Sequence, residues 1–451
     1  MNTRLLFSTV FLLLAGVLIS LMPEQAAAQN RKSSYAEVHN GDVHYKWMNN
    51  DDLIEVRLKG DIAFTADDRA VESLSRDGLL KVEERIDGIR RTLEVRPASD
   101  GTPRYTYEVN GRQRAYDATT RDAVADLILT VIRNTGIGAD RRVARILKQE
   151  GLDGVFDEID EIDSGSARRK YFVALLEEGN LGVAALQRVA EEVTRQITSG
   201  GDRGRFLKQA APYYLENSQT HAAYFDAVGT IPSSGDHTRV LKHVLAEHRP
   251  DREALVQLLH SARRITSSGD KARVLKDATM HYDNHPDVRT AFFDAADSIP
   301  SSGDQTRVLK ALLTNAALDA ASVTALFRSA KGISSSGDKA RLLIAAAPHF
   351  MNDDAQRSAF FDAVNTIPST GDHARVLSTL LREQRLDKVS LKALLASAQT
   401  INASGDKARV LIAAAGLVAG DDDLVEAYLA AAETIASSGD HSRALSALVK
   451  Q

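Results

Sequence analysis

The residues of this chain that could do chemistry recur in fixed columns. An aspartate returns with a constant 34-residue period from Asp202 to Asp440, and an arginine stands three positions after each of its eight copies. Opposite charges at this spacing share one face of a helix and can form an ion pair. We interpret the pairs as a structural ladder that ties the repeats together, with Asp236, Arg239, Asp270, Arg273, Asp304 and Arg307 among its members. A stripe that binds anionic partners is the alternative.

A second column lies six positions after the aspartate and changes along the chain. The later copies carry isoleucine or serine in place of a lysine, whereas the first four copies carry Lys208, Lys242, Lys276 and Lys310. A strictly structural position would not change half-way, so we predict these four lysines as candidate partner-binding residues. A solvated helix face is the simpler interpretation of this column and the one that we favour.

The sequence offers no catalytic or metal-binding constellation. Asp226, Asp294 and Asp362 lie two repeats apart, and His237, His373 and His441 lie four and two repeats apart, so neither set can form one acid/base pair or one metal site. No His-Glu-x-x-His motif and no glycine-rich phosphate loop is present. We expect a protein that is not an enzyme and needs no cofactor; an enzyme on envelope polymers would need a cleft with paired carboxylates.

Two helices in each repeat are predicted to position these columns. Each copy has an isoleucine five positions before the aspartate and a leucine five positions after it, and apolar residues on both sides recur at steps of three and four. A Ser-Ser-Gly-Asp break such as 233–236 separates the two helices, with the first serine as N-cap of the second helix. In-phase repeats of this length predict a solenoid of about nine helical hairpins, taken as right-handed like most such stacks.

A longer, 68-residue period lies over the first. Pro232, Pro300 and Pro368 follow the isoleucine only in alternate copies, and the residue after the aspartate alternates between His or Gln and Lys. Paired aromatic residues in the first helix follow the same alternation. We therefore predict that two hairpins, four helices in all, form the duplicated unit.

The N-terminal segment, residues 1–28, has the pattern of a signal peptide. Arg4 precedes an apolar run from Leu5 to Met22, and three alanines before Gln29 suit cleavage. An uncleaved membrane anchor is the alternative. The chain has no cysteine and a net charge of −5, which argue against disulfides and against general nucleic-acid binding. We expect a periplasmic or secreted bacterial protein with no integral membrane domain after cleavage.

Residues 36–118 change to the period of a β-strand. Segments such as 53–58 and 79–84 alternate apolar with charged residues, and Asp87-Gly88 and Asn110-Gly111 mark turns. We predict a small antiparallel meander of five or six strands with one solvent-exposed face. It contains the only tryptophan of the chain, Trp47. Residues 119–198 are predicted as a helical linker with a degenerate first repeat, and residues 199–451 as the solenoid. The predicted fold class is therefore α+β.

The Ser-Ser-Gly-Asp helix start followed by Arg-x-Leu resembles exported bacterial α-helical-repeat proteins of the HEAT-like kind. Such repeats also occur in periplasmic segments of relatives of the beta-lactam-sensing membrane metallopeptidases, and the stretches 78–85 and 109–111 resemble their strand-rich partner domain. The chain has no zinc motif and no membrane bundle, so the resemblance implies a repeat scaffold and no peptidase activity.

Together these features favour a protein-interaction or sensing scaffold that works through its helical-repeat surface. Its partner would be another envelope or secreted protein. The alternative is a cell-wall or glycan-associated binding protein in which the β domain, with Trp47, contacts the ligand.

Overall fold

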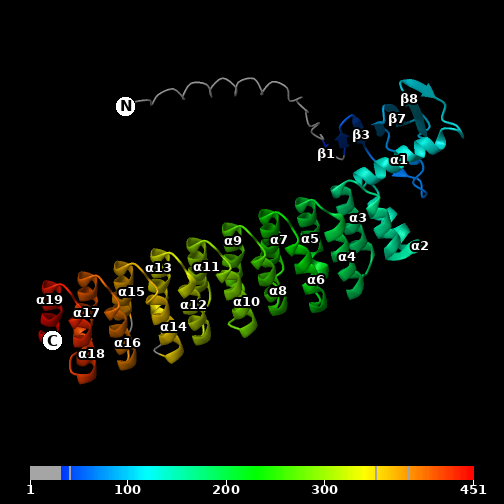
Figure 1. Cartoon of the computed structure of the whole chain (residues 1–451). Helices are drawn as coiled ribbons and strands as arrows, with labels where there is room; N and C mark the ends of the chain where they lie inside the picture. Colours follow the sequence, from blue (N-terminus) through cyan, green and yellow to red (C-terminus); the bar gives the residue numbers. More distant parts are fainter. Residues whose placement is uncertain (1–31, 40–41, 351–352, 384) are drawn as a thin grey trace, which may run out of the picture. The chain divides into compact units, whose positions relative to one another are not determined.

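A computed structural model describes residues 32–39, 42–350, 353–383 and 385–451 of the chain. These residues form two compact units, with the boundary between Ile137 and Gly138 (Figure 1). The predicted signal segment, residues 1–28, lies outside the described residues. No helix in the described ranges is long and apolar enough to cross a membrane.

The first unit is built on a seven-stranded antiparallel sheet whose strands follow one another in chain order, as in a meander. Its strands are β1 (Lys32–His39), β2 (Asp42–Asn49), β3 (Asp52–Lys59), β6 (Leu79–Ile86), β7 (Ile89–Pro97), β8 (Pro103–Val109) and β9 (Arg112–Arg114). A separate hairpin is formed by β4 (Ile62–Phe64) and β5 (Val71–Leu74). The predicted meander is confirmed, but five or six strands were too few. The hairpin strands are too short to show alternation, and the edge strand β9 is entirely polar.

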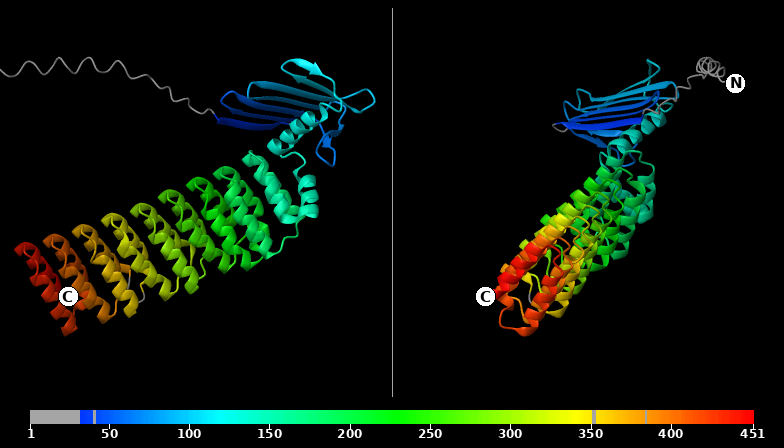
Figure 2. Two further views of the ribbon diagram at one scale, coloured as in Figure 1. Left: turned by 45° about the vertical axis from the view of Figure 1, so that its right-hand side comes forward. Right: turned by 60° about the vertical axis from the view of Figure 1, so that its left-hand side comes forward.

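Helix α1 (Arg121–Thr135) covers one face of this sheet (Figure 2). Val124, Leu127 and Val131 from the helix are fully buried against residues such as Val82 and Leu93 from the strands. The helix therefore belongs to the β unit, whereas the sequence placed residues from 119 onward in a helical linker. Its apolar stripe fits the sheet because the inward residues at the centre of the sheet, such as Val56, Val82 and Leu93, are apolar.

In the residues that the structure describes, the second unit is a stack of nine helical hairpins, which confirms the predicted α+β solenoid fold (Figure 1). The first helices of the hairpins are α2 (Ala139–Asp160), α4 (Val183–Gln196), α6 (Ser218–Gly229), α8 (Arg252–Arg263), α10 (Pro286–Asp297), α12 (Ala320–Gly332), α14 (Asp354–Val364), α16 (Lys388–Gln399) and α18 (Asp422–Glu433). The second helices are α3 (Gly165–Glu178), α5 (Gly200–Leu215), α7 (Ser234–Glu247), α9 (Ser268–Ala278), α11 (Ser302–Asn315), α13 (Ser336–Ala346), α15 (Thr370–Glu383), α17 (Ser404–Val418) and α19 (Ser438–Val449). Short 3-10 turns follow α9 and α13, at η1 (Thr279–His281) and η2 (Ala347–His349).

From α4 onward each helix packs mainly against a helix of the same kind in a neighbouring hairpin, so the unit has one layer of first helices and one layer of second helices, whereas α2 and α3 of the first hairpin pack mainly against each other. The repeated packing begins at α2, earlier than the predicted start of the solenoid at residue 199. Gly151, with φ of 72°, interrupts the helical backbone inside α2.

The serine caps of the second helices follow the prediction. In seven of the eight full repeats the serine hydroxyl accepts a hydrogen bond from the backbone N–H of the repeat aspartate, at 3.3 to 3.4 Å. Ala403 holds the cap position of α17 and forms no such bond. Ser164 caps the degenerate repeat in the same way, although Ala167 has replaced its aspartate.

The core between the two layers is continuous along the stack and shows the 68-residue period. The aromatic pairs of alternate first helices are buried in edge-to-face contact, with ring centroids 5.0, 5.7 and 5.4 Å apart: Tyr224–Phe225, Phe292–Phe293 and Phe360–Phe361. This geometry is favourable for aromatic rings and adds to the area they bury.

Candidate functional site

In the seven full repeats from Asp202 to Asp406, the residue directly after the aspartate is buried and ties one hairpin to the next, whereas His441 in the eighth is only partly buried. In alternate repeats it is a cation that reaches the C-terminal end of the first helix of the following hairpin. The bonds join Arg203 Nη1 to Thr230 O at 2.8 Å, Lys271 Nζ to Ser298 Oγ at 2.8 Å, Lys339 Nζ to Thr366 Oγ1 at 2.6 Å and Lys407 Nζ to Thr434 Oγ1 at 2.6 Å. Positive charge at this end of a helix complements the helix dipole. Burial lowers the pKa of all four cations.

In the other repeats the same position holds a neutral side chain that reaches a serine in the following hairpin. The bonds join His237 Nε2 to Ser261 Oγ at 3.0 Å, Gln305 Nε2 to Ser329 Oγ at 3.4 Å and His373 Nε2 to Ser397 Oγ at 2.9 Å. Burial lowers the pKa of His237 and of His373 to about 4, so both rings are neutral near pH 7. The 68-residue period is therefore a period of inter-hairpin contacts.

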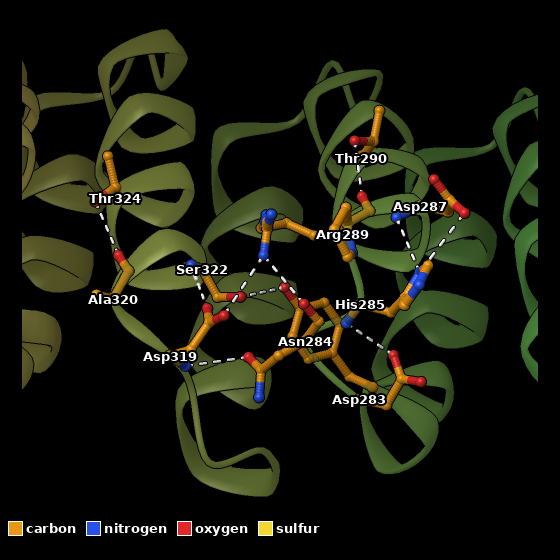
Figure 3. Close-up of polar contacts among 12 residues, drawn as sticks. Asp283, Asn284, His285, Asp287, Arg289, Thr290, Asp319, Ala320, Ser322 and Thr324 are labelled. Carbon is orange, nitrogen blue, oxygen red and sulfur yellow. Dashed lines mark hydrogen bonds and ion pairs between the residues drawn. The ribbon is translucent and has the colours of Figure 1, made fainter.

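The opposite ends of the hairpins are tied by a separate polar network (Figure 3). Between α9 and α12, the guanidinium of Arg289 donates to the carbonyl of Asn284 at 3.0 Å and lies 3.6 Å from the carboxylate of Asp319, the N-cap of α12. The Asn284 side chain accepts from the backbone N–H of Asp319 at 3.1 Å. Arg357 and Asp387, two repeats further on, form the equivalent ion pair at 3.4 Å. These groups stabilise the stack and leave its outer faces free for other roles.

The predicted column of aspartates and arginines lies on the second helices. Each arginine pairs with the aspartate three positions before it in the same helix, as in Asp236–Arg239, Asp270–Arg273 and Asp304–Arg307. The eight arginine side chains are 51–70% exposed, whereas the aspartate side chains are only 10–20% exposed. These ion pairs thus form within one helix, and the contacts between hairpins described above come from other residues. The column presents guanidinium groups to solvent.

The four predicted lysines lie on α5, α7, α9 and α11, one helical turn after the arginines. Lys242 pairs with Asp277 of the neighbouring helix at 3.1 Å. Lys208, Lys276 and Lys310 form no ion pair with another described residue. We call the surface formed by the arginine column and the column three positions after it the outer face of the second-helix layer.

A hollow of about 590 Å³ opens on this outer face where the lysine column ends. It is lined by Lys310, Gly337, Arg341, Ile344, Ala345, Asp372 and Arg375, which belong to α11, α13 and α15. Ile344 and Ala345 supply apolar surface, and three cations surround it. Asp372 is already bound to Arg375 at 2.8 Å. The arrangement suits an apolar group that lies beside a carboxylate.

The residues considered for catalysis have other partners. Asp226 binds Arg264 at 2.8 Å and Asp362 lies 3.4 Å from Lys331, in both cases across neighbouring first helices. Among the described residues no group of three histidine, aspartate or glutamate side chains is placed to hold a metal ion. Trp47 is partly buried on the helix-covered side of the sheet, packed against the core there.

Sequence reasoning missed the inter-hairpin role of the residue after the aspartate. The alternation of His or Gln with Lys was visible and predicted the 68-residue unit, but the histidines were weighed only as metal ligands. The partner serines Ser261, Ser329 and Ser397 recur with the same 68-residue period, so their spacing could have identified the contacts.

Comparisons with known proteins give no relative for this arrangement: no protein-family model, curated protein or solved structure matches the chain.

Proposed function

We propose that this chain is an exported scaffold that captures a partner polypeptide on the outer face of its second-helix layer. The observation that carries the proposal is the hollow at Lys310, Ile344 and Arg375, which combines an apolar floor with cations at its edge. An extended segment of the partner would place an apolar side chain in the hollow and acidic side chains on the neighbouring arginines. Solenoids commonly bind partners on such extended surfaces.

The charge arrangement supports this assignment. Ion pairs at an exposed surface contribute little stability, with typical values of about 0–1 kcal/mol. Each repeated arginine can therefore leave its aspartate and bind a carboxylate of the partner with only a small loss of folding stability. Lys310, which has no ion pair with a described residue, adds further positive charge at the edge of the hollow.

We propose a binding role and no catalytic one, because each aspartate of the outer face is already paired with the arginine three positions after it. Glycan binding through Trp47 is not favoured, because that side chain packs against the sheet core. The partner would be a protein of the cell envelope or a secreted protein, in line with the signal-like N-terminal segment. The resemblance to exported HEAT-like repeat proteins agrees with this role.

The test is in-cell crosslinking from a photoreactive residue at Lys242 or Lys310, with Thr290 on the layer of first helices as the matched control position. We expect one protein to be captured from both lysine positions and not from Thr290. Its capture should fall when Ile344→Glu is introduced, because this change puts a carboxylate into the hollow. Equal capture from Thr290, or capture that Ile344→Glu leaves unchanged, would refute the proposal.

A further inference from the structure

The face of the sheet opposite α1 has an excess of positive charge. Its outward side chains include five carboxylates, Asp42, Glu55, Glu83, Glu94 and Glu108, and eight cations, Lys46, Arg57, Lys59, Lys81, Arg85, Arg90, Arg96 and Arg104. Residues 32–137 as a whole contain 16 Lys and Arg against 19 Asp and Glu. The cations are thus concentrated on one face of an acidic unit.

The strand register sets cations directly opposite one another. Arg57 lies opposite Lys81, Arg85 opposite Arg90, and Arg96 opposite Arg104. Like charges in direct cross-strand positions destabilise a sheet. Three such pairs on one face are a local conflict with folding, and conflicts of this kind are expected where a surface has a function.

The glutamates on this face do not cancel the excess. Glu55 accepts hydrogen bonds from Arg57 at 2.6 Å and from His44 at 3.0 Å, and Glu83 binds Arg90 at 2.9 Å. Lys81 and Arg104 form no ion pair with another described residue.

The cations also extend further into solvent than the carboxylates. The side chains of Arg57 and Arg96 are 60% and 57% exposed, whereas those of Glu55 and Glu83 are 19% and 22% exposed. A partner that approaches this face therefore meets guanidinium and ammonium groups first.

The shape and chemistry of the face indicate the kind of partner. Five strands of about eight residues cover on the order of 600 Å², which approaches the roughly 800 Å² that each protein contributes to a standard interface. The outward residues of β2, β3, β6, β7 and β8 include no phenylalanine, tyrosine or tryptophan, so bases of a single-stranded nucleic acid would find no such ring to stack on. The fixed carboxylates between the cations would repel a uniformly negative polymer or lipid surface. A folded protein can match a pattern of mixed sign.

We propose that this uncovered sheet face is a docking surface for an acidic patch on a folded partner protein. The surface belongs to the first unit and the hollow to the second, so the two proposed sites consist of different residues. The acidic partner would dock on the sheet through charge complementarity, and the partner proposed for the repeats would lie along the second helices.

The test uses the full chain with a photoreactive residue at Thr106, a neutral position on the sheet face. We expect it to capture a protein, and we expect the double change Lys81→Glu and Arg104→Glu to reduce that capture roughly tenfold or more, because opposite charges steer and hold the encounter. Neither cation has an ion pair with a described residue to lose, so folding should be preserved, which the melting temperature checks. Arg76→Glu with Arg121→Glu, a charge reversal elsewhere in the same unit, is the matched control and should leave capture unchanged.

A second measurement, the salt dependence of binding, tests the proposal without using the variants. Binding of the purified captured protein to the unmodified chain should weaken steeply between about 50 and 300 mM salt, since exposed charges are screened over about 10 Å at 0.1 M. Capture that survives charge reversal, salt-independent binding, or crosslinks only to lipid, glycan or polyphosphate would overturn the proposal. Loss of this partner with continued capture from Lys310 would separate it from the function proposed for the repeats.

Discussion

Replacing His237 and His373 by glutamine should remove much of the acid sensitivity of the solenoid. Both rings are buried between hairpins, and each donates from Nε2 to a serine whose own hydroxyl donates onward, to the carbonyl of Phe225 or to the side chain of Asn365. A glutamine amide can donate in the same way, as Gln305 does at the equivalent position. The substitution therefore keeps the hydrogen bond and removes the titrating group.

The magnitude follows from the lowered pKa of each ring. Burial moves the pKa from an ordinary value of 6.5 to about 4, so above pH 6.5 both folded and unfolded chains hold a neutral histidine. As the pH falls from 6.5 towards 4, each of these histidines binds a proton in the unfolded chain but stays neutral in the folded chain. The free energy of unfolding then falls by about 2 kcal/mol per histidine at pH 5 and by about 3 kcal/mol at pH 4.

The assay is urea unfolding of the double variant and the unmodified chain at pH 7.5 and at pH 5, combined with hydrogen exchange of the peptides from α7 to α8 and from α15 to α16. Local exchange is needed because a solenoid does not unfold as one cooperative unit. At pH 7.5 the two proteins should have similar protection, and at pH 5 the variant should keep protection that the unmodified chain loses. An equal loss in both proteins would show that these rings titrate normally, and the reasoning would fail.

Two further substitutions test the local contacts. Ala403→Ser should raise the free energy of unfolding by about 1 kcal/mol, because it restores the helix cap that the other full repeats have, and a urea midpoint that does not rise would contradict the capping argument. Lys271→Met should lower the free energy of unfolding by about 1–2 kcal/mol, because Ser298 loses the hydrogen bonds that Lys271 donates to its carbonyl and hydroxyl. Lys271→Arg is the control, since Arg203 makes the equivalent contacts, and equal stability of the Met and Arg variants would show that the charge has no role.

Much of the helical unit could be predicted from the sequence because the residues that define its helices lie close together in the chain. The caps depend on residues three positions apart, and the apolar stripes depend on helical spacing, so both are visible within one repeat. The contact between His237 and Ser261 joins different hairpins. Its geometry depends on how hairpins stack, which no single repeat contains.

The β unit was less predictable because its contacts join strands that are distant in the sequence. The outward cations alternate along each strand and could be listed from the sequence, but the register that sets Arg57 opposite Lys81 depends on the pairing of strands that are separated by the β4–β5 hairpin. The assignment of α1 also required tertiary information. In the sequence, an amphipathic helix that precedes a solenoid looks like one of the solenoid helices. Only the tertiary structure shows that the apolar face of α1 packs on the sheet.

The alternation between cationic and neutral contacts limits how this array can change in length. Deletion of a single repeat from the middle would place a lysine next to a serine that normally binds a histidine or glutamine. Alternatively, it would place a histidine next to a helix C-terminus that normally binds a cation. Deletion of two adjacent repeats would restore every contact in phase. Gains and losses of repeats in this lineage should therefore occur two at a time, and a designer who wants a longer or shorter array should cut it in steps of four helices.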